Sequence, residues 1–335
     1  MKIRIRSSNT LVGRAVLAAV QSEPDFDVVE QGADVVLDTG CVPAGIEAVT
    51  SALEAGEHWV DLCWQRAWAE SIAELDAVAK EKGRAVVVSA GAFCGLTDPF
   101  VRSAADQMVR VNEVQLGLAV GSGSGLDSGS MGQFLAGRER TIRMLIGGEW
   151  SEREFYGDRR AFGFPPPVGD LFGGNADCAD LFAFTQRPVR SASVRLTVAP
   201  PSGLAERGAR TFLSWVRRGW IKSPEERPEK VMGWIDRLGG TKPSALAIAV
   251  RGIGSTRLPL EMRFGFVPPV ERPEVLSVAP ALETLRSLAA DPVPGAGPCS
   301  GRVERTALSE RLRRGGVEIV EGDLGGWRRP VPATS

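Results

Sequence analysis

The sequence is poor in the side chains that most often transfer protons or bind metals: its 335 residues include one histidine and one tyrosine. A histidine-dependent catalytic triad has a single candidate, His58, and a site with three histidines cannot be built from one chain. His58 starts a short apolar run, at the end opposite to the one where parallel sheets bind ligands, which favours a structural role. We predict no metal site.

The sequence also lacks an excess of charge and a long apolar run. Lys and Arg number 40 and Asp and Glu number 41, so no net field attracts nucleic acid or anionic lipid. No apolar stretch is long enough to span a bilayer, and the charged start does not resemble a signal peptide. Five cysteines do not suggest a secreted disulfide framework. We expect a cytoplasmic protein with reduced thiols that binds a small molecule, and neither nucleic acid nor a membrane.

The sequence does contain short apolar runs that alternate with stretches of helical spacing. The apolar runs are Ala33–Gly40, His58–Leu62 and Arg84–Gly91, and the helical stretches are Ala44–Ala55 and Trp68–Lys80. Strands that alternate with helices form a parallel sheet through right-handed crossovers. The carboxyl ends of such strands lie along one edge, where ligands bind. We therefore predict an α/β fold with its site at this edge.

A cysteine follows each of the three apolar runs: Cys41, Cys63 and Cys94. One interpretation is a nucleophilic thiol, a thiol pair or a soft-metal site, and the other is three independent buried residues, since free cysteine is often buried. The absence of C-x-x-C spacing favours the second. Cys94 precedes a predicted helix, whose N-terminus would lower the pKa of the thiol. Among the functional versions, Cys94 as a residue that faces the substrate is the best candidate.

Two aspartates stand near the same strand ends. Asp61 ends the second apolar run and Asp38 lies near the end of the first. A carboxylate at a ligand-binding edge can act as a general base or hold an amine. Alternatively, Asp38 caps the following helix and Asp61 pins a neighbouring loop. The candidate catalytic residues are thus Cys94, Asp61 and Cys41, and Cys63 is a candidate substrate contact.

The chain begins with a predicted strand, Lys2–Arg6, a tight turn and a helix, the arrangement in which dinucleotide-binding proteins carry G-x-G-x-x-G. The three glycine positions hold Ser8, Thr10 and Gly13. The third glycine, which lets the helix pack close to the strand, is present. The first two are replaced by small hydroxyl residues, which can still donate hydrogen bonds to an anion at a helix N-terminus.

The nucleotide-binding half is also short. A predicted strand at Asp25–Glu30 is followed almost at once by the next strand at Ala33. A complete half needs a further helix and strand here, with an acidic residue that holds the adenosine ribose. Glu30 or Asp27 can take that role, although a solvated charge at a strand end is the simpler interpretation.

Four segments resemble the saccharopine dehydrogenase-like family in order and spacing: Gly56–Leu62, Ala85–Asp106, Phe164–Asp170 and Gly295–Gly301. The resemblance covers most of the chain and is poor over the first forty residues. It implies a Rossmann-type domain followed by a domain with a mixed sheet, and NAD(P)-linked oxidoreduction of an amino-acid-like substrate. The chain departs from the family at two glycines of the phosphate loop. It departs again at Cys94, where the family has a proline.

The resemblance also implies site residues. The pyrophosphate would lie over the turn, hydride transfer would occur beside the glycines that follow the strands, and a tyrosine and an arginine of the second domain would contact the substrate. Arginine is suited to a substrate carboxylate. The predicted cofactor residues are Ser7, Ser8, Thr10, Gly13, Gly40 and Gly91, and the predicted substrate residues are Tyr156 and Arg160, with Cys63.

We predict three regions: a shortened Rossmann-type domain at 1–111, an α+β domain at 112–275, and a C-terminal helical segment at 276–335 that returns to the first domain. Local patterns predict a helix at Asp98–Val109 capped by Asp98, and a helix, turn and strand over Ile142–Gly157. They also predict an extended segment at Phe164–Asp170 and a helix that starts at Pro280.

The segment Leu204–Ile221 combines aromatic residues with four arginines. Aromatic and basic residues together can stack single-stranded nucleic acid. Without a net basic field, core packing or a subunit contact is favoured, and we expect a homodimer.

Three hypotheses on function follow. The first is an NAD(P)-linked oxidoreductase. The second is an enzyme on the same scaffold that has lost the dinucleotide and catalyses a cyclisation, isomerisation or elimination in the vacated cleft. The third is a non-catalytic member that binds a ligand or forms an oligomer. The loss of two glycines from the phosphate loop keeps the second open.

Overall fold

The computed structural model describes residues 1–40, 42–121, 141–185, 189–199 and 243–327, together with Thr211 and Trp215. The chain divides into two compact units. Unit 1 comprises Met1–Arg110, Cys178–Val189 and Glu274–Gly315, and unit 2 comprises Val111–Asp177, Arg190–Pro273 and Gly316–Ser335. The predicted C-terminal region 276–335 is thus shared between the units, because its helices belong to unit 1 and its last strands to unit 2.

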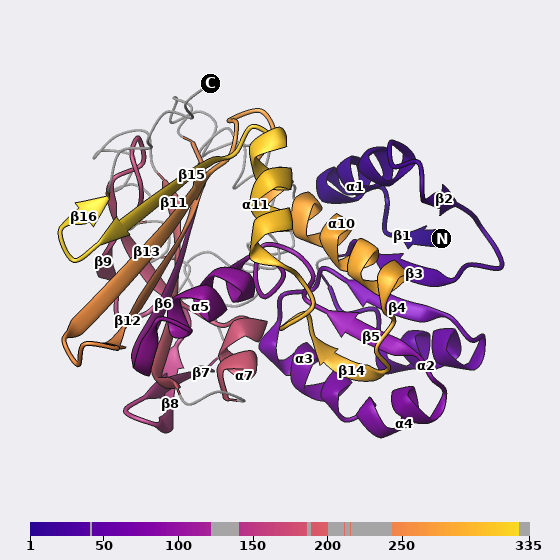
Figure 1. Ribbon diagram of the computed structural model, residues 1–335, viewed down its shortest axis with the longest axis horizontal. Helices are drawn as coiled ribbons and strands as arrows, with labels where there is room; N and C mark the ends of the chain where they lie inside the picture. The colour runs from indigo at the N-terminus through magenta and orange to yellow at the C-terminus, as the bar shows by residue number, and fades with distance from the viewer. Residues whose placement is uncertain are drawn as a thin grey trace. The chain divides into compact units, whose positions relative to one another are not determined.

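Unit 1 is built on a six-stranded sheet whose paired strands are all parallel, in the order β14-β5-β4-β3-β1-β2 (Figure 1). The strands are β1 (Lys2–Arg6), β2 (Asp27–Val28), β3 (Val35–Asp38), β4 (His58–Asp61), β5 (Ala85–Val88) and β14 (Gly295–Pro298). The central strands β3, β4 and β5 are buried along their whole length, as expected of a parallel sheet covered on both faces. The strand order changes direction beside β1, so the carboxyl ends of β1 and β3 flank the topological switch point.

Helices cover both faces of this sheet (Figure 1), with α1 and α10 on one face and α3 and α4 on the other. The helices of unit 1 are α1 (Leu11–Gln21), α2 (Ile46–Glu54), α3 (Arg66–Ala73), α4 (Asp76–Glu81), α5 (Thr97–Ala105), α7 (Ala179–Thr185), α10 (Val275–Ala290) and α11 (Arg305–Arg314). On α1 the buried residues Gly13, Val16 and Val20 recur at helical spacing and form the face that packs inward. The predicted strand–helix alternation is confirmed.

Two predicted helices have different bounds in the structure. The stretch Trp68–Lys80 forms two helices, because the Leu75 N–H bonds to the Ile72 carbonyl, three residues back, and ends the first helix. The C-terminal helix α10 begins at Val275, so Pro280 lies inside it rather than at its start. Residues of α10 on both sides of this proline are buried, and tertiary packing outweighs the lost backbone hydrogen bond.

The predicted N-cap role of Asp98 is wrong. Helix α5 begins at Thr97 with Leu96 at the N-cap position, and the Asp98 side chain is buried. Its carboxylate accepts hydrogen bonds from the Ser300 hydroxyl (3.0 Å) and the Gly301 N–H (2.9 Å), just past the end of β14. A partner 200 residues away has replaced the local one, and Asp98 ties α5 to the strand that the chain adds last to this sheet.

Unit 2 contains a larger, mixed sheet in the order β16-β15-β13-β12-β6-β11-β10-β9, to which β7 and β8 are added through β11. Its strands are β6 (Met108–Gly121), β7 (Thr141–Ile146), β8 (Glu149–Glu154), β9 (Arg160–Gly163), β10 (Asp170–Ala176), β11 (Val189–Ala199), β12 (Ala245–Gly254), β13 (Pro259–Val267), β15 (Glu318–Asp323) and β16 (Gly326–Trp327). With the parallel sheet of unit 1, it confirms the predicted α/β fold class.

The helix predicted at the start of Ile142–Gly157 is wrong, because this segment forms the β7–β8 hairpin. Its apolar run is short, and such a run fits a strand or a buried helix equally well. Gly147 and Gly148 both have positive φ (65° and 97°), as a two-residue hairpin turn requires. The glycine turn therefore decides for a strand hairpin and against the predicted helix.

The proline-rich segment Phe164–Asp170 is a turn that joins β9 to β10, rather than an extended strand. The Val168 and Gly169 N–H groups both bond to the Pro165 carbonyl. This turn places Phe162 and Phe164 over small residues of the sheet, and a Cβ added at Gly117 would lie 2.4 Å from the Phe162 ring. The resulting core of unit 2 consists of Ala119, Phe162, Phe164, Val168, Ala245, Ala247 and Val267.

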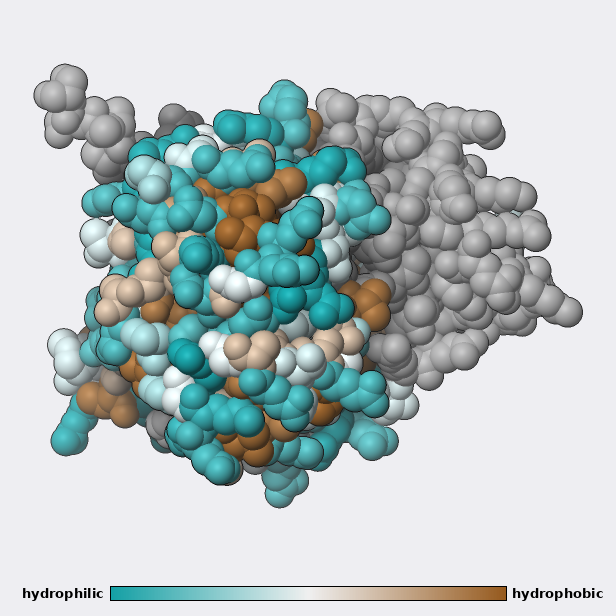
Figure 2. Space-filling model, turned by 90° about the vertical axis from the view of Figure 1, so that its right-hand side faces the viewer, coloured by the Kyte–Doolittle hydropathy of each residue, from teal (hydrophilic) through white to brown (hydrophobic). Residues whose placement is uncertain are grey.

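On the face shown in Figure 2, the exposed apolar side chains of the described residues are dispersed. Figure 2 shows a largely hydrophilic face on which apolar residues form separate small areas, and Val42, Ile46 and Val293 are among the exposed apolar residues. Scattered residues of this kind do not mark an interface, so the homodimer stays a prediction. Among the helices that the structure describes, none combines the length and the apolar character needed to cross a bilayer. The predicted aromatic helix 204–221 lies outside the described residues except at Thr211 and Trp215, which are helical.

The close packing of α1 on β1 gives a test of the fold. A Cβ at Gly13 would lie 2.4 Å from the Ser7 carbonyl oxygen and 2.8 Å from the Ser8 Cα, so backbone must move. We expect Gly13→Ala to lower the free energy of unfolding by about 1–3 kcal/mol. Gly297→Ala is the control, because nothing lies within 4 Å of its added Cβ, and it should change stability by less than about 0.5 kcal/mol. Equal urea midpoints for the two variants would contradict this packing.

Candidate functional site

The turn between β1 and α1 is organised by Thr10. Its side-chain oxygen accepts a hydrogen bond from the Gly13 N–H at 2.9 Å, so Thr10 is the N-cap of α1. The first intrahelical bond runs from the Arg14 N–H to the Thr10 carbonyl (2.9 Å). The N–H groups of Leu11 and Val12 come before it, and the helix does not use them. Both residues are partly exposed, so this end of α1 is open to an anion.

Gly13 has the packing role that the sequence predicts. The Ser7 carbonyl, which lies directly against it, also accepts a hydrogen bond from the Thr39 hydroxyl (3.0 Å). The same hydroxyl lies 2.9 Å from the Arg6 carbonyl. Thr39 is fully buried and connects the end of β3 to the end of β1. Ser7 has a φ of 59°, a left-handed conformation more usual for glycine.

Gly40 lies beside this turn. A Cβ added there would lie 3.1 Å from the Ser7 Oγ and 3.1 Å from the Asp38 Oδ1. The Gly40 N–H donates to the Asp38 Oδ1 (2.9 Å), so Asp38 fixes the start of this loop. The Asp38 carboxylate also lies 3.9 Å from the Arg6 guanidinium. That guanidinium lies over the Trp59 ring. The structure thus brings together Ser7, Thr10, Gly13 and Gly40. Cys41, which follows them, lies outside the described residues.

These contacts determine how closely the phosphate groups of a dinucleotide could approach the turn. Two unused N–H groups, the hydroxyls of Ser7 and Ser8, and the nearby Arg6 guanidinium suit a phosphate group. The side chain of Thr10, however, occupies the position where a glycine lets the pyrophosphate approach the helix. The turn therefore fits an anionic phosphate, held farther from the helix than a complete glycine-rich loop would hold it.

Asp61 organises the ends of β4 and β5. It is buried, and its carboxylate accepts four hydrogen bonds, two of them from the indoles of Trp59 (3.2 Å) and Trp68 (2.7 Å). The other two come from the backbone N–H groups of Cys63 (3.0 Å) and Ser89 (3.2 Å). Burial raises the pKa of Asp61 to about 7, although all four donors favour the charged form. The side chain pins two loops and titrates near neutrality.

Cys63 and Gly91 lie in these pinned loops. Cys63 is buried, and its carbonyl accepts a hydrogen bond from the Ser89 hydroxyl (2.6 Å). A Cβ at Gly91 would lie 3.6 Å from the Ser277 Oγ on α10 and 3.7 Å from the Leu62 carbonyl, which is ordinary contact. The backbone hydrogen bonds of Cys63 to Asp61 and Ser89 therefore hold this residue in place. Gly91 lies between the loop that follows β4 and helix α10.

Cys94 is fully buried, and its thiol is not activated. Burial raises the pKa of the Cys94 thiol well above its ordinary value, and the negative charge of Asp180 raises it further. The predicted lowering of this pKa by the helix N-terminus is wrong, because the desolvation of the thiolate outweighs the helix dipole. Cys94 also has a φ of 59°, so its backbone forms a tight turn before α5.

Asp180 is a buried titratable residue beside this turn that the sequence patterns do not predict. It lies at the start of α7, more than 80 residues beyond the loop that it contacts, and is fully buried. Its carboxylate accepts hydrogen bonds from the Cys94 N–H (2.9 Å), the Thr97 hydroxyl and the Cys178 thiol (3.4 Å). Burial raises the pKa of Asp180 to about 6. The only signal in the sequence is one acidic residue inside an apolar run.

Two cysteines outside the predicted set lie near Cys94. Cys178 and Cys299 are both buried and contribute to the raised pKa of Cys94. The Cys299 Sγ lies 3.1 Å from the Thr284 hydroxyl, and burial raises its pKa to about 12. In the described part of the chain, no three His, Cys, Asp or Glu side chains are arranged to hold a metal ion. These thiols fill the core behind the edge.

His58 has the structural role that its position suggests. Its Nδ1 accepts a hydrogen bond from the Ala85 N–H (2.9 Å) and links β4 to β5. Burial and the charge of Arg84 lower the pKa of His58, so the ring is neutral at pH 7.

The predicted substrate residues Tyr156 and Arg160 both belong to unit 2 and have different surroundings. The Arg160 guanidinium pairs with Asp158 (3.0 Å) and lines a cavity of about 320 Å³. Tyr156 does not line this cavity, and its ring lies under the Arg159 guanidinium instead. Tyr156 has a φ of 55° and Asp158 a φ of 41°, so this segment holds two non-glycine residues in the left-handed region.

The fold resembles solved dehydrogenases. The structure matches apo saccharopine dehydrogenase (L-Glu forming) from Saccharomyces cerevisiae over 96% of this chain and 99% of that chain, with a TM-score of 0.62 and 11% identity. Weaker matches include a meso-dapdh variant with DAP from Clostridium tetani (TM-score 0.44, 12% identity, 93% and 98% covered). Another is an amine dehydrogenase from Mycobacterium smegmatis (TM-score 0.40, 10% identity, 88% and 94% covered). No family model and no curated protein sequence matches the chain. The likeness establishes a Rossmann-type dehydrogenase fold and agrees with the predicted resemblance at that level.

The raised pKa of Asp180 gives a pH-dependent test. In the folded state the proton is retained up to about pH 6, whereas an unfolded aspartate loses it near pH 4. The stabilising contribution of Asp180 is therefore complete below pH 4 and is lost as the pH rises through 6, by up to about 3 kcal/mol. Asp180→Asn removes the titration and keeps one side-chain oxygen that can still accept a hydrogen bond from the Cys94 N–H. We expect the free energy of unfolding of the wild type to fall relative to this variant between pH 4 and 7; parallel urea profiles would refute the assignment.

Proposed function

We propose that this chain is an NAD(P)-linked oxidoreductase of the saccharopine dehydrogenase type, which acts on a small amino-acid-like substrate. The observation that carries the proposal is the β1–α1 turn at the switch point of a parallel sheet. There Gly13 makes the close contact of a dinucleotide-binding turn, and the first N–H groups of α1 are left for an anion. The similarity in fold to saccharopine dehydrogenase supports the same assignment.

Each residue of the edge has a part in this proposal. Ser7 and Ser8, with the N–H groups of Leu11 and Val12, would hold the phosphate, and Arg6 would add positive charge beside it. The nicotinamide, when bound, supplies or accepts the hydride. Gly40 and Gly91 border the edge without side chains, which leaves room for a flat ring.

Asp61 is the titratable group of this edge best matched to proton transfer near neutral pH, since its pKa is raised to about 7. It is also buried under four hydrogen bonds, so its part in the proposal is to position the loops after β4 and β5. Cys94 and Cys63 are buried behind those loops and take no part in transfer. Cys41 stays a candidate catalytic residue.

A second function is favoured by the side chain of Thr10 and by the short nucleotide-binding half. The two-residue strand β2 leads directly into β3, with no helix between them. An enzyme that has given up the dinucleotide would retain this scaffold and catalyse a cyclisation, isomerisation or elimination at the same edge. It would bind neither NADH nor NADPH at millimolar concentration.

Titration of NADH and NADPH, followed by nucleotide fluorescence, separates the two functions. The wild type should bind one of them, and Thr10→Gly should lower its Kd by about tenfold, because the pyrophosphate then reaches the helix. The loss of the cap costs only a few tenths of a kcal/mol with glycine. Thr10→Ser is the matched control, since it retains the capping hydroxyl. No binding of either nucleotide by the wild type or by Thr10→Gly would exclude the first function.

A further inference from the structure

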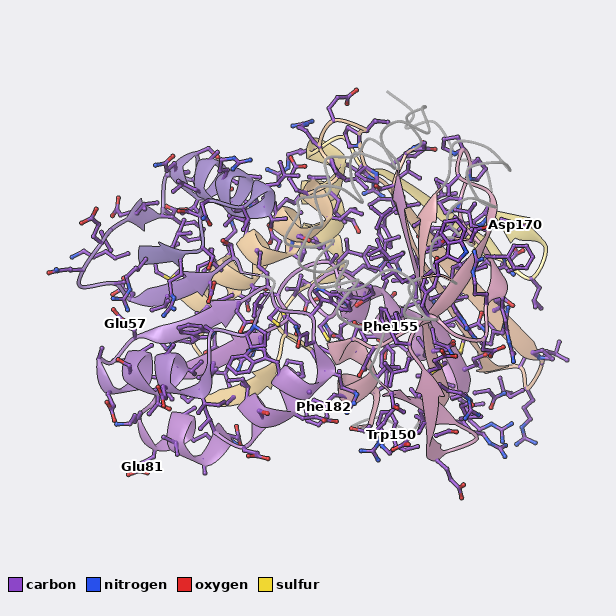
Figure 3. All side chains as sticks on the ribbon, turned by 180° about the vertical axis from the view of Figure 1, so that it is seen from behind. Glu57, Glu81, Trp150, Phe155, Asp170 and Phe182 are labelled. Atoms are coloured by element: carbon purple, nitrogen blue, oxygen red, sulfur yellow. The ribbon has the colours of Figure 1, made fainter. Side chains whose placement is uncertain are left out.

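Unit 2 contains a cavity of about 320 Å³ that the dinucleotide does not explain. Its walls come from β6, β7, β8, β9 and β11, so it lies wholly within this unit. In Figure 3, the labelled Trp150 lies in β8 and Phe155 directly follows the last residue of this strand. The volume is that of a site for a small molecule.

Three arginines line the cavity: Arg153, Arg160 and Arg195. The Arg195 side chain is 9% exposed. Its guanidinium donates to the Asp158 carbonyl (2.7 Å) and to the Asn175 side-chain oxygen, which fix its position. Burial lowers the pKa of Arg195, but an arginine keeps its charge at pH 7.

The two acidic residues of the lining are already paired. Asp158 lies 3.0 Å from Arg160 and 3.8 Å from Arg195. Glu113 pairs with Arg251 (2.9 Å), which is not part of the lining. Three guanidinium groups therefore line the cavity, and Asp158 is the one carboxylate of the lining that pairs with them.

Arg153 is the arginine of the lining whose charge is not neutralised by a described carboxylate. Its guanidinium donates to the Ser151 hydroxyl and to the Glu152 carbonyl (2.7 Å), and it forms no ion pair with another described residue. Ser193, also in the lining, has no hydrogen-bond partner in the part of the chain that the structure describes. A guanidinium without a counter-ion and a free hydroxyl in one cavity suit an anion.

The rest of the lining is apolar. Met144, Leu145 and Ile146 of β7 form one wall and Phe162 of β9 another. Such a surface suits a short aliphatic chain and excludes a strongly hydrated group. The left-handed backbone at Asp158, held by Arg195, is a local strain of the kind that concentrates at binding sites.

We propose that this cavity binds a small aliphatic carboxylate, whose carboxylate group is held by Arg153 and Arg160 and whose chain packs against Met144 and Phe162. Arg195 positions Asp158 through its hydrogen bond to the Asp158 carbonyl, and Asp158 in turn positions Arg160 through their ion pair. The proposal goes beyond the proposed function and does not depend on it, because the cavity lies wholly within unit 2. Binding itself requires no nucleotide.

Glutarate, a five-carbon dicarboxylate, is the probe, titrated calorimetrically at low ionic strength without nucleotide. We expect saturable binding by the wild type and at least a tenfold higher Kd for the double variant Arg153→Gln, Arg160→Gln. Both side chains are exposed, so the variant should retain its fold by circular dichroism. Arg143→Gln is the matched control, because Arg143 is an exposed arginine of β7 that does not line the cavity, and its Kd should equal that of the wild type.

Three results would overturn the proposal: no binding of glutarate by the wild type, an unchanged Kd in the double variant, or inorganic phosphate binding more tightly than glutarate. Glutaramide, which has the same shape without charge, should not bind. A protein that binds glutarate but neither NADH nor NADPH would retain this site and lose the proposed oxidoreductase function. The reverse result would remove the site and leave that function standing.

Discussion

Buried carboxylates hold the loops at the carboxyl edge of the parallel sheet. Asp61 accepts four hydrogen bonds and joins the loops after β4 and β5. Asp98 joins α5 to the loop after β14, and Asp180 joins α7 to the turn at Cys94. A charge buried without partners would cost several kcal/mol, so each aspartate is tolerated only because several donors converge on it. The positions of those donors, and hence of the loops, are fixed in return.

This constraint divides the edge into a rigid part and an open part. The loops that contain Cys63 and Cys94 are pinned and buried, and burial raises the pKa of the Cys94 thiol, which makes it less reactive. The turn from Ser7 to Gly13 is held from below by Thr39 and remains accessible above. This turn is the part of the described edge that we expect an anion to reach. The dinucleotide hypothesis depends on whether Thr10 leaves room for it there.

Sequence patterns predict those features that depend on residues close together in the chain. The buried strands and the close packing at Gly13 follow from apolar runs and from the spacing of one turn. Asp98 was misassigned because a helix cap is a local rule, whereas its carboxylate is satisfied by Ser300, far along the chain. Asp180 could not be found for the same reason. The apolar run at Ile142 fits two kinds of structure, and only the hairpin with its partner strand decides between them.

Hydrogen–deuterium exchange of Asp61→Asn tests the central claim most directly. An asparagine offers one oxygen and one NH₂ group to four donors, so at least two donors lose their acceptor. If the carboxylate fixes the loops, peptides covering residues 62–65 and 89–97 will exchange faster than in the wild type, while the peptide covering β1 keeps its protection. Unchanged exchange at residues 89–97 in a variant that is still folded would show that the edge is held by something else.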